Sequence, residues 1–440
     1  MILTGRTGLL ALVCVLPIAV APWPAIAFAI LLAVLAGAVA LDVALAASPR
    51  ALQYTHSGDT SARLGEPVRV GLLIRNGGSR TFRGAVRDAW APSARATPRA
   101  HQVSIAAGQQ HQVHTSLQPI RRGDQLSAAI TARCVGPLGL AGRQRSQQAP
   151  WTVRILPPFL SRKHLPSRLA KLRELDGMVP VLIRGQGTEF DSLREYVVGD
   201  DVRSIDWRAT ARRSDVVVRT WRPERDRRVV IVVDTGRTSA GRVGVDPTAG
   251  DPGGWPRLDW YLDAALLLAA LAARAGDHVD FLAHDRSTRA AVVNASRTEL
   301  LAQLVEAMAP LEPELVESDS RALVAAISRR VRRRALVVLL TDLNAAALDE
   351  GLLPVLPQLA AKHQVVVAAV SDPRIDDLAG GRTDAAAVYD AAAAEKSRND
   401  RRAIASRLRA AGVDVVDALP EELAPALADS YLAMKATGRL

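Results

Sequence analysis

The chain has 440 residues, of which 49% are hydrophobic and 23% are charged. This balance excludes a chain that is disordered throughout, and the length favours two or three domains over one core. The formal net charge of +11 favours anionic surroundings, but the charge is scattered and no nucleic-acid module is recognisable. We therefore favour solvated or membrane-facing charge over nucleic-acid binding.

The first predicted element, residues 1–48, is a transmembrane helical hairpin. Residues 8–47 are almost continuously apolar, which is about twice the ~20 residues that one helix needs to cross a bilayer. A Pro-Trp-Pro turn at residues 22–24 separates two predicted spans, residues 3–21 and 24–46, and Pro17 is expected to kink the first. Asp42, near the end of the second span, is expected to reach the lipid headgroups.

The charges beside this hairpin predict its orientation. Arg6 precedes it, while Arg50 and Arg63 follow it, so the positive-inside rule places both ends and the soluble body in the cytoplasm, at the inner or plasma membrane. A cleaved signal peptide is the alternative, but the second apolar stretch is too long for one.

Residues 49–158 are predicted to form an all-β sandwich of the immunoglobulin-like type. Short alternating runs such as VRVGLLIRN, HQVHTSL and TVRIL are separated by turn residues at the spacing typical of such a sandwich. These strands contain no cluster of catalytic residue types.

Residues 159–226 are predicted to form a charged connector. Its centre brings Asp and Glu close to several arginines, which permits two interpretations: an acidic catalytic or metal cluster, or a network of Arg–carboxylate pairs around a small core of Tyr196 and Trp207. We favour the structural network, because nearly every acid has an arginine close to it in sequence.

Residues 227–440 are predicted to form an α/β doubly wound, Rossmann-like domain. Runs such as VVIVVD, ALVVLLTD and QVVVAAVSD are apolar on both faces and alternate with helical runs, which indicates a parallel sheet covered on two sides. Ligands of such sheets lie at the carboxyl ends of the strands. The Gly-, Pro- and Asp-rich residues 241–256 are either a lid over these ends or a tolerated insertion.

Two of these strands end in an acidic residue. Asp234, with Thr238 in the loop that follows it, and Asp342 from another strand would supply oxygen ligands of the kind that Mg²⁺ or Mn²⁺ prefers. The alternative is that both carboxylates cap helices and loops without an ion.

The spacing resembles the metal-ion-dependent adhesion site of von Willebrand factor A domains, whose first loop reads Asp-x-Ser-x-Ser. Residues 234–238 read Asp-Thr-Gly-Arg-Thr, so a glycine replaces the first serine. The second element of that site, a threonine, has Ser318 or Ser320 as its nearest candidate, and the third matches Asp342. The resemblance implies a degraded Mg²⁺ site formed by Asp234, Thr238 and Asp342.

Residues 190–212, FDSLREYVVGDDVRSIDWRATAR, resemble the hallmark of the domain-of-unknown-function fifty-eight family, with Val198 in place of a common proline. The order of parts also agrees over the chain, including a Pro-Leu-Gly-Leu segment at residues 137–140. The resemblance implies a membrane-anchored protein with a von Willebrand factor A-like domain that acts with AAA+ ATPases of the MoxR type in assembling or maturing other proteins.

We therefore expect a membrane-anchored, non-enzymatic adaptor whose A-type domain binds a protein partner, with Mg²⁺ as its one candidate cofactor. Two alternatives stay open. The first is a metal- or nucleotide-dependent enzyme at the strand ends, against which the first loop lacks both G-x-G-x-x-G and G-x-x-x-x-G-K-[ST]. The second is a basic membrane-surface or nucleic-acid-binding module.

Overall fold

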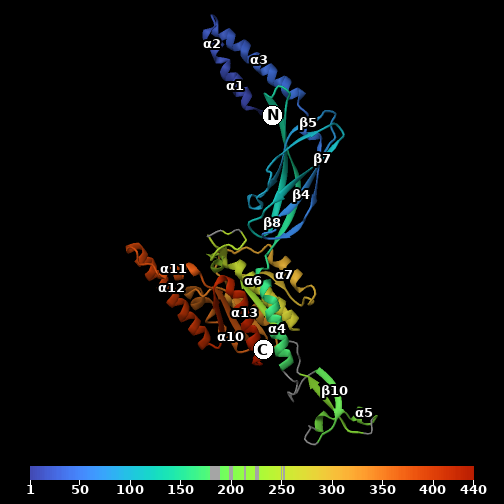
Figure 1. Ribbon diagram of the computed structural model, residues 1–440, viewed down its shortest axis with the longest axis vertical. Helices are drawn as coiled ribbons and strands as arrows, with labels where there is room; N and C mark the ends of the chain where they lie inside the picture. The colour runs from blue at the N-terminus through green and yellow to red at the C-terminus, as the bar shows by residue number, and fades with distance from the viewer. Residues whose placement is uncertain (179–188, 198–201, 213–214, 223–226, 249, 251–252) are drawn as a thin grey trace. The chain divides into compact units, whose positions relative to one another are not determined.

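A computed structural model of the chain describes residues 1–178, 189–197, 202–212, 215–222, 227–248, 250 and 253–440. The chain divides into two compact units, Met1–Leu156 and Pro157–Leu440, which are described separately below (Figure 1).

The first unit begins with an apolar helical hairpin. One arm consists of α1 (Gly5–Val13) and α2 (Val15–Val20), and the other is α3 (Pro24–Leu45). The first arm breaks at Cys14, so Pro17 lies in the first turn of α2, where its missing N–H needs no partner. Among the described residues, one helical stretch, Pro24–Ala51, is long and apolar enough to cross a membrane, and the broken arm, Gly5–Val20, is shorter.

Asp42, in the last turn of α3, is fully buried (0% exposed). Its carboxylate accepts hydrogen bonds from the backbone N–H groups of Leu138 at 2.8 Å, Leu140 at 2.7 Å and Ala141 at 2.8 Å. The prediction that Asp42 reaches the headgroups is wrong, because a turn distant in sequence supplies the donors that water or headgroups would otherwise supply.

Two sheets in this unit enclose one hydrophobic core. One has the order β1-β9-β8-β5-β6, with β3 paired to β9, and the other has the order β2-β4-β7. Side chains of both sheets, among them Leu72 and Phe82, pack in the same core, which also holds the free Cys134. The strands are β1 (Ile2–Leu3), β2 (Leu52–Gly58), β3 (Ser61–Arg63), β4 (Val68–Asn76), β5 (Phe82–Trp90), β6 (His101–Ile105), β7 (Gln110–Leu117), β8 (Gly123–Val135) and β9 (Ala141–Leu156).

The second unit contains a six-stranded sheet of order β16-β15-β12-β17-β18-β19. All neighbours are parallel except β15 and β16, and the central strands are buried throughout, as expected for apolar runs covered on both faces. From β12 the chain first adds β15 and β16 on one side of the sheet and then β17, β18 and β19 on the other. The winding therefore reverses between β12 and β17. The strands are β12 (Arg228–Asp234), β15 (His278–His284), β16 (Thr288–Val292), β17 (Leu336–Leu340), β18 (Gln364–Val370) and β19 (Asp414–Ala418).

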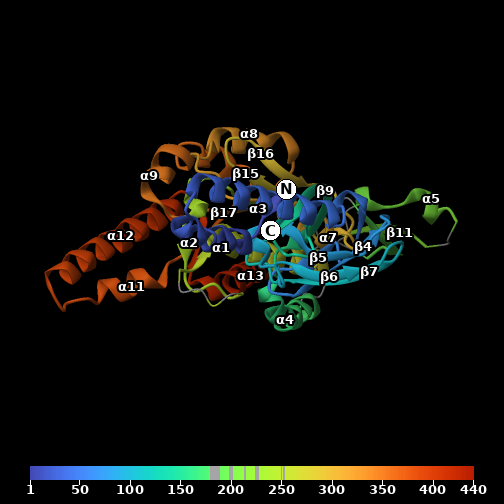
Figure 2. The same cartoon turned by 90° about the horizontal axis from the view of Figure 1, so that it is seen from above.

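Helices cover both faces of this sheet. α6 and α13 pack together on one face, while α8, α10 and the last turns of α12 form a core with the other. α11 and α12 lie side by side (Figure 2). The helices are α6 (Arg257–Arg274), α7 (Leu300–Met308), α8 (Ser320–Arg330), α9 (Ala345–Ala347), α10 (Leu356–Ala360), α11 (Pro373–Ala379), α12 (Ala385–Ala410) and α13 (Pro420–Ala436). The strands β13 (Arg242–Val243) and β14 (Trp255–Pro256) pair at the base of the predicted lid or insertion.

The connector begins with α4 (Leu165–Met178), which packs on α6 and α13. Farther along, β10 (Glu189–Glu195) and β11 (Val217–Arg222) form an antiparallel pair. Asp206 caps the short helix α5 (Trp207–Thr210) by accepting from two backbone N–H groups, each at 3.0 Å. Trp207 is 66% exposed, so the prediction that it forms a small core with Tyr196 is wrong. Asp200 and Asp201 lie outside the described residues.

Candidate functional site

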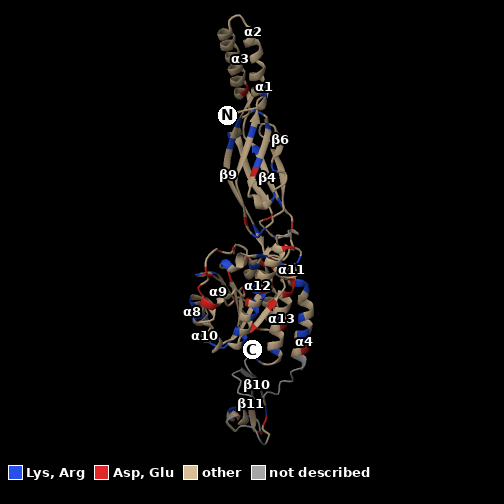
Figure 3. Cartoon of the chain, turned by 90° about the vertical axis from the view of Figure 1, so that its left-hand side faces the viewer, with Lys and Arg blue, Asp and Glu red and all other residues tan. Residues whose placement is uncertain are grey.

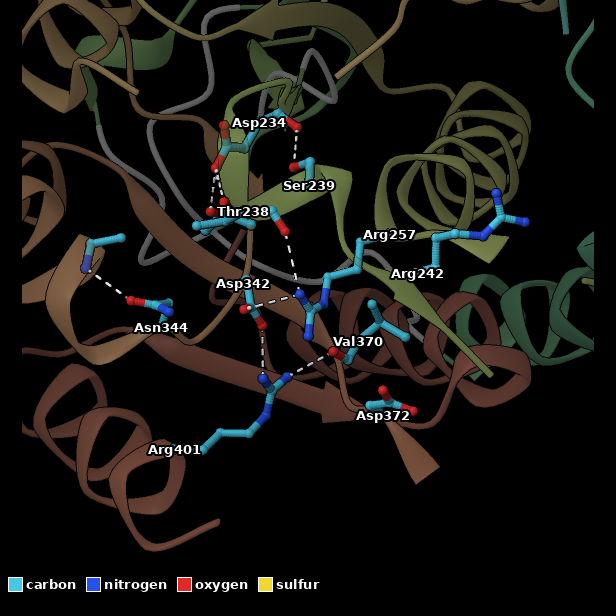
Figure 4. A network of polar contacts seen from close by, with 12 residues as sticks. Asp234, Thr238, Ser239, Arg242, Arg257, Asp342, Asn344, Val370, Asp372 and Arg401 are labelled. Atoms are coloured by element: carbon cyan, nitrogen blue, oxygen red, sulfur yellow. Dashed lines mark hydrogen bonds and ion pairs between the residues drawn. The ribbon is translucent and has the colours of Figure 1, made fainter. Parts of the chain in front are cut away.

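The carboxylate of Asp234 lies at the carboxyl end of β12, beside Thr238 (Figure 4). It accepts four hydrogen bonds. The backbone N–H of Gly236 at 2.8 Å and the hydroxyl of Ser318 at 2.5 Å donate to Oδ1. The hydroxyls of Thr341 at 2.7 Å and Thr238 at 3.1 Å donate to Oδ2. An ionised carboxylate has about four acceptor sites, so that of Asp234 is fully used.

The position of Ser318 explains the glycine in the Asp234 loop. A Cβ atom at Gly236 would lie 2.2 Å from the Ser318 hydroxyl oxygen and 3.0 Å from the carbonyl oxygen of Val316. The φ of −77° at Gly236 suits any residue, so space and not backbone conformation requires glycine. Of the two serines considered from the sequence, the structure thus brings Ser318 to Asp234, whereas Ser320 begins α8.

Asp342 follows β17 and is engaged by two arginines. Its Oδ1 lies 2.8 Å from the guanidinium of Arg401, on α12, and its Oδ2 lies 3.5 Å from that of Arg257, on α6. Arg401 also binds Asp417 at 2.8 Å, and burial lowers its pKa, but the hydrogen bonds and charges of the two carboxylates outweigh burial and raise it. The side chains are at most 18% exposed in the Asp342 pairs, so these charges depend on one another for compensation.

These contacts describe the surroundings of the predicted Mg²⁺ ligands. Asp234 and Thr238 adjoin each other and, with two further hydroxyls, offer the clustered oxygens that Mg²⁺ accepts. Asp342 is instead paired with two guanidinium groups, which a cation at its carboxylate would have to displace. The described part of the chain holds no group of three or more His, Cys, Asp or Glu residues suited to a metal. Magnesium binding by Asp234 and Thr238 stays a prediction.

A cavity of about 230 Å³ opens beside Asp234. Polar groups from three strand ends line one side, and apolar side chains of Val316, Leu323, Leu348 and Leu352 line the other. An ion pair between Arg237 and Glu317, 2.6 Å apart and well exposed, lies among its lining residues. Apolar walls with a few fixed polar groups are typical of ligand-binding cavities.

His284 belongs to the same cavity, and the sequence analysis missed it. It ends β15, in register with Asp234, is 4% exposed, and its Nε2 lies 3.3 Å from the carbonyl oxygen of Asp319. Burial lowers its pKa, against smaller opposing effects of Asp319 and Asp285, so the ring is neutral near pH 7. Nδ1 has no hydrogen-bond partner among the described residues. The sequence signal that could have identified His284 is its position as the last residue of a predicted parallel strand, at the same end of the sheet as Asp234.

Comparison with known proteins gives the following relatives. A family model described as "Protein of unknown function DUF58" matches residues 192–415. Uncharacterised proteins of Mycobacterium bovis and Mycobacterium tuberculosis are each 26% identical to the chain over 196 residues, 44% of its length. The match spans 58% of the length of these relatives.

Two solved structures are similar to parts of the chain. The CARDB domain of a Pyrococcus furiosus protein is 12% identical with a TM-score of 0.18, covering 26% of this chain and 90% of that one. An exo-β-N-acetylglucosaminidase of Vibrio harveyi is 12% identical with a TM-score of 0.21, covering 82% of this chain and 75% of that one. These TM-scores are too low to bear on the fold.

Proposed function

The chain belongs to the family described as "Protein of unknown function DUF58", which supplies no function, so we propose one from the site itself. We propose that the chain is a membrane-anchored, non-enzymatic adaptor that binds a protein partner in the cavity beside Asp234. Its α/β domain is of the von Willebrand factor A type, its hairpin spans the membrane twice, and its soluble body lies in the cytoplasm. A MoxR-type AAA+ ATPase is the proposed partner, in the assembly or maturation of other proteins.

The observation that carries this proposal is the hydroxyl shell around Asp234. The hydroxyls of Thr238, Ser318 and Thr341 each donate their hydrogen to the carboxylate, so the remaining lone pairs of each oxygen are acceptors. A shell of acceptors around a fixed negative charge suits a lysine or arginine side chain of a partner.

The rest of the cavity supports a protein segment as the occupant. Its apolar wall, with Leu323 and Leu348, suits an aliphatic side chain beside that lysine or arginine. The carboxylate of Asp234 already holds four donors, which suits a fixed contact better than a proton acceptor in catalysis.

The experiment is a binding measurement between the full-length protein in detergent and the purified MoxR-type AAA+ ATPase of the same organism. Ser318→Ala and Asp234→Asn are compared with Ser296→Ala, a serine-to-alanine control at an exposed position away from the cavity. We expect Ser318→Ala to weaken binding roughly fivefold or more, the effect of losing one hydrogen bond to a charged group, and Ser296→Ala to leave it unchanged. Thermal unfolding of each variant shows whether it is folded.

Two outcomes contradict the proposal. One is that the wild-type protein fails to retain the ATPase. The other is that folded Ser318→Ala and Asp234→Asn forms retain it as well as the control does. Titrating Mg²⁺ into the protein alone decides the separate question of the ion: binding by the wild-type protein but not by Asp234→Asn requires a metal at Asp234, and absence of binding removes the metal from the proposal.

A further inference from the structure

The net positive charge of this chain belongs entirely to one of its two units. Residues 1–156 contain sixteen arginines, no lysine and five carboxylates, a formal net charge of +11, which equals that of the whole chain. Residues 157–440 contain forty basic and forty acidic residues and are formally neutral. The unit that carries the apolar helix therefore carries all of the excess charge (Figure 3).

Four of these arginines belong to the segments that surround the C-terminal end of α3. Arg80 donates to the carbonyl oxygens of Ala44 at 2.8 Å and Leu45 at 3.2 Å, and Arg143 donates to that of Val43 at 3.0 Å.

The other two arginines at this end have exposed side chains. The guanidinium of Arg6 lies against Gly139, 2.7 Å from where a Cβ would stand. The exposed Arg50 lies five residues after Leu45, the last residue of α3, in the short 3-10 helix Pro49–Ala51. Arg6, Arg50, Arg80 and Arg143 are called the arginine collar below.

Carboxylates do not balance the collar. Asp42 is the one carboxylate at this end, and it is buried against three backbone N–H groups. Asp88 is buried within the sandwich. Asp59, Glu66 and Asp124 lie near the starts of β4 and β8, whose other ends adjoin the hairpin.

The length of α3 places the collar at the depth of lipid headgroups. Its 22 residues rise about 33 Å at 1.5 Å per residue, close to the ~30 Å hydrocarbon thickness of a bilayer. With Pro24 at one interface, the end at Leu45 lies at the other. Leu138, 49% exposed in the turn bound to Asp42, adds an apolar side chain at the same end.

We propose that the arginine collar is a binding surface for anionic phospholipid headgroups, which holds the β domain against the membrane. Guanidinium groups pair well with phosphate, and each basic residue near an anionic membrane surface strengthens attachment severalfold. This inference rests on the proposal that the hairpin spans the membrane.

The test uses full-length protein reconstituted in phosphatidylcholine vesicles that contain a trace of spin-labelled phosphatidylglycerol or spin-labelled phosphatidylcholine. Electron paramagnetic resonance measures the fraction of each labelled lipid that the protein immobilises. We expect the wild-type protein to prefer phosphatidylglycerol, and this preference to fall as salt shortens the Debye length from ~10 Å at 0.1 M to ~3 Å at 1 M.

The decisive variant is Arg6→Gln/Arg50→Gln, which leaves the helix-capping Arg80 and Arg143 intact. Its matched control is Arg69→Gln/Arg99→Gln, which removes the same charge away from the collar, at other exposed positions of this unit. We expect the collar variant to lose the phosphatidylglycerol preference by up to about fivefold for each arginine removed. The control is expected to keep the preference, and Arg6→Lys/Arg50→Lys to retain most of it.

Equal association of both lipids with the wild-type protein, or an equal loss in the control variant, overturns the proposal. So does binding of duplex DNA to protein in phosphatidylcholine vesicles that the collar variant loses, since the collar would then be a nucleic-acid surface. Protein that fails to float with the vesicles contradicts the membrane anchor itself, which separates that failure from a failure of the collar.

Discussion

The hydroxyl oxygen of Ser318 lies 2.2 Å from where a Cβ atom at position 236 would stand, so it occupies the space that any residue other than Gly236 would need. Ser318 is separated by 84 residues from Asp234, yet its hydroxyl takes part in the same carboxylate shell as the neighbours of Asp234 in sequence. The hydrogen bond from Ser318 to Asp234 therefore requires a glycine at position 236.

Gly236→Ala is expected to destabilise the protein by about 1–3 kcal/mol, because the added methyl group forces Ser318 away from Asp234. In the double variant Gly236→Ala/Ser318→Ala the colliding oxygen is absent, so the two effects are expected to be less than additive. Thermal unfolding of the four proteins in detergent measures this coupling. Additive effects would show that the two positions do not share space.

Arg401→Ala is expected to cost roughly 3 kcal/mol, because it leaves the buried carboxylate of Asp342 with only the more distant guanidinium of Arg257. It also removes the partner of the more exposed Asp417. Arg398→Ala, on the same helix and 34% exposed, is the control and is expected to cost no more than about 1 kcal/mol. Chemical denaturation compares the two. Equal losses would show that the Arg401 pairs contribute no more than surface pairs.

Asp263 gives the α/β unit an expected pH dependence. Burial raises its pKa to about 6, against the hydrogen bond donated by the backbone N–H of Ser161 at 3.1 Å. The folded protein thus holds a proton between about pH 4 and 6 that the unfolded chain has released, so this group stabilises the fold at low pH and the benefit is lost as pH rises through 6. Asp263→Asn is expected to remove this loss, which a series of unfolding curves from about pH 4 to pH 7 measures. Identical pH slopes in both proteins would contradict the raised pKa.

Asp42→Asn is expected to release the turn after β8. The neutral amide accepts at one oxygen only, whereas the carboxylate accepts from three N–H groups at its two oxygens. Hydrogen exchange of the amides of Leu138, Leu140 and Ala141 in reconstituted protein is expected to quicken, while exchange in the sheet strands stays unchanged. Unaltered protection of these three amides would show that Asp42 does not hold the turn.

The fold of the α/β unit was accessible from sequence because its strands are apolar on both faces and its helices lie between them. The carboxyl ends of β12 and β17 follow from that order, and with them the neighbourhood of Asp234 and Thr341. The resemblance to the domain-of-unknown-function fifty-eight family is confirmed by the family model over residues 192–415.

The hydrogen-bond and ion-pair partners of individual side chains could not be predicted from the sequence in this way. Asp342 has the spacing of a metal ligand, but Arg401 reaches it from 59 residues away, and no local pattern signals that pair. Asp42 has the sequence position of an interfacial residue, but the backbone N–H groups that donate to its carboxylate come from a turn 96 or more residues later, after strands β2 to β8. Contacts of this kind depend on tertiary packing, which hydrophobic periodicity does not encode.

The Asp42 contact has a consequence for how the protein is made. In the proposed membrane-spanning arrangement, a chain synthesised from its N-terminus presents the apolar hairpin to the membrane while Leu138, 96 residues later, is still untranslated. The carboxylate of Asp42 then reaches the membrane boundary before its final donors exist, and water or headgroups hold it in the meantime. Completion of the β8–β9 turn supplies the three N–H donors, so the C-terminal end of α3 gains its final contacts only after β8 and β9 have formed.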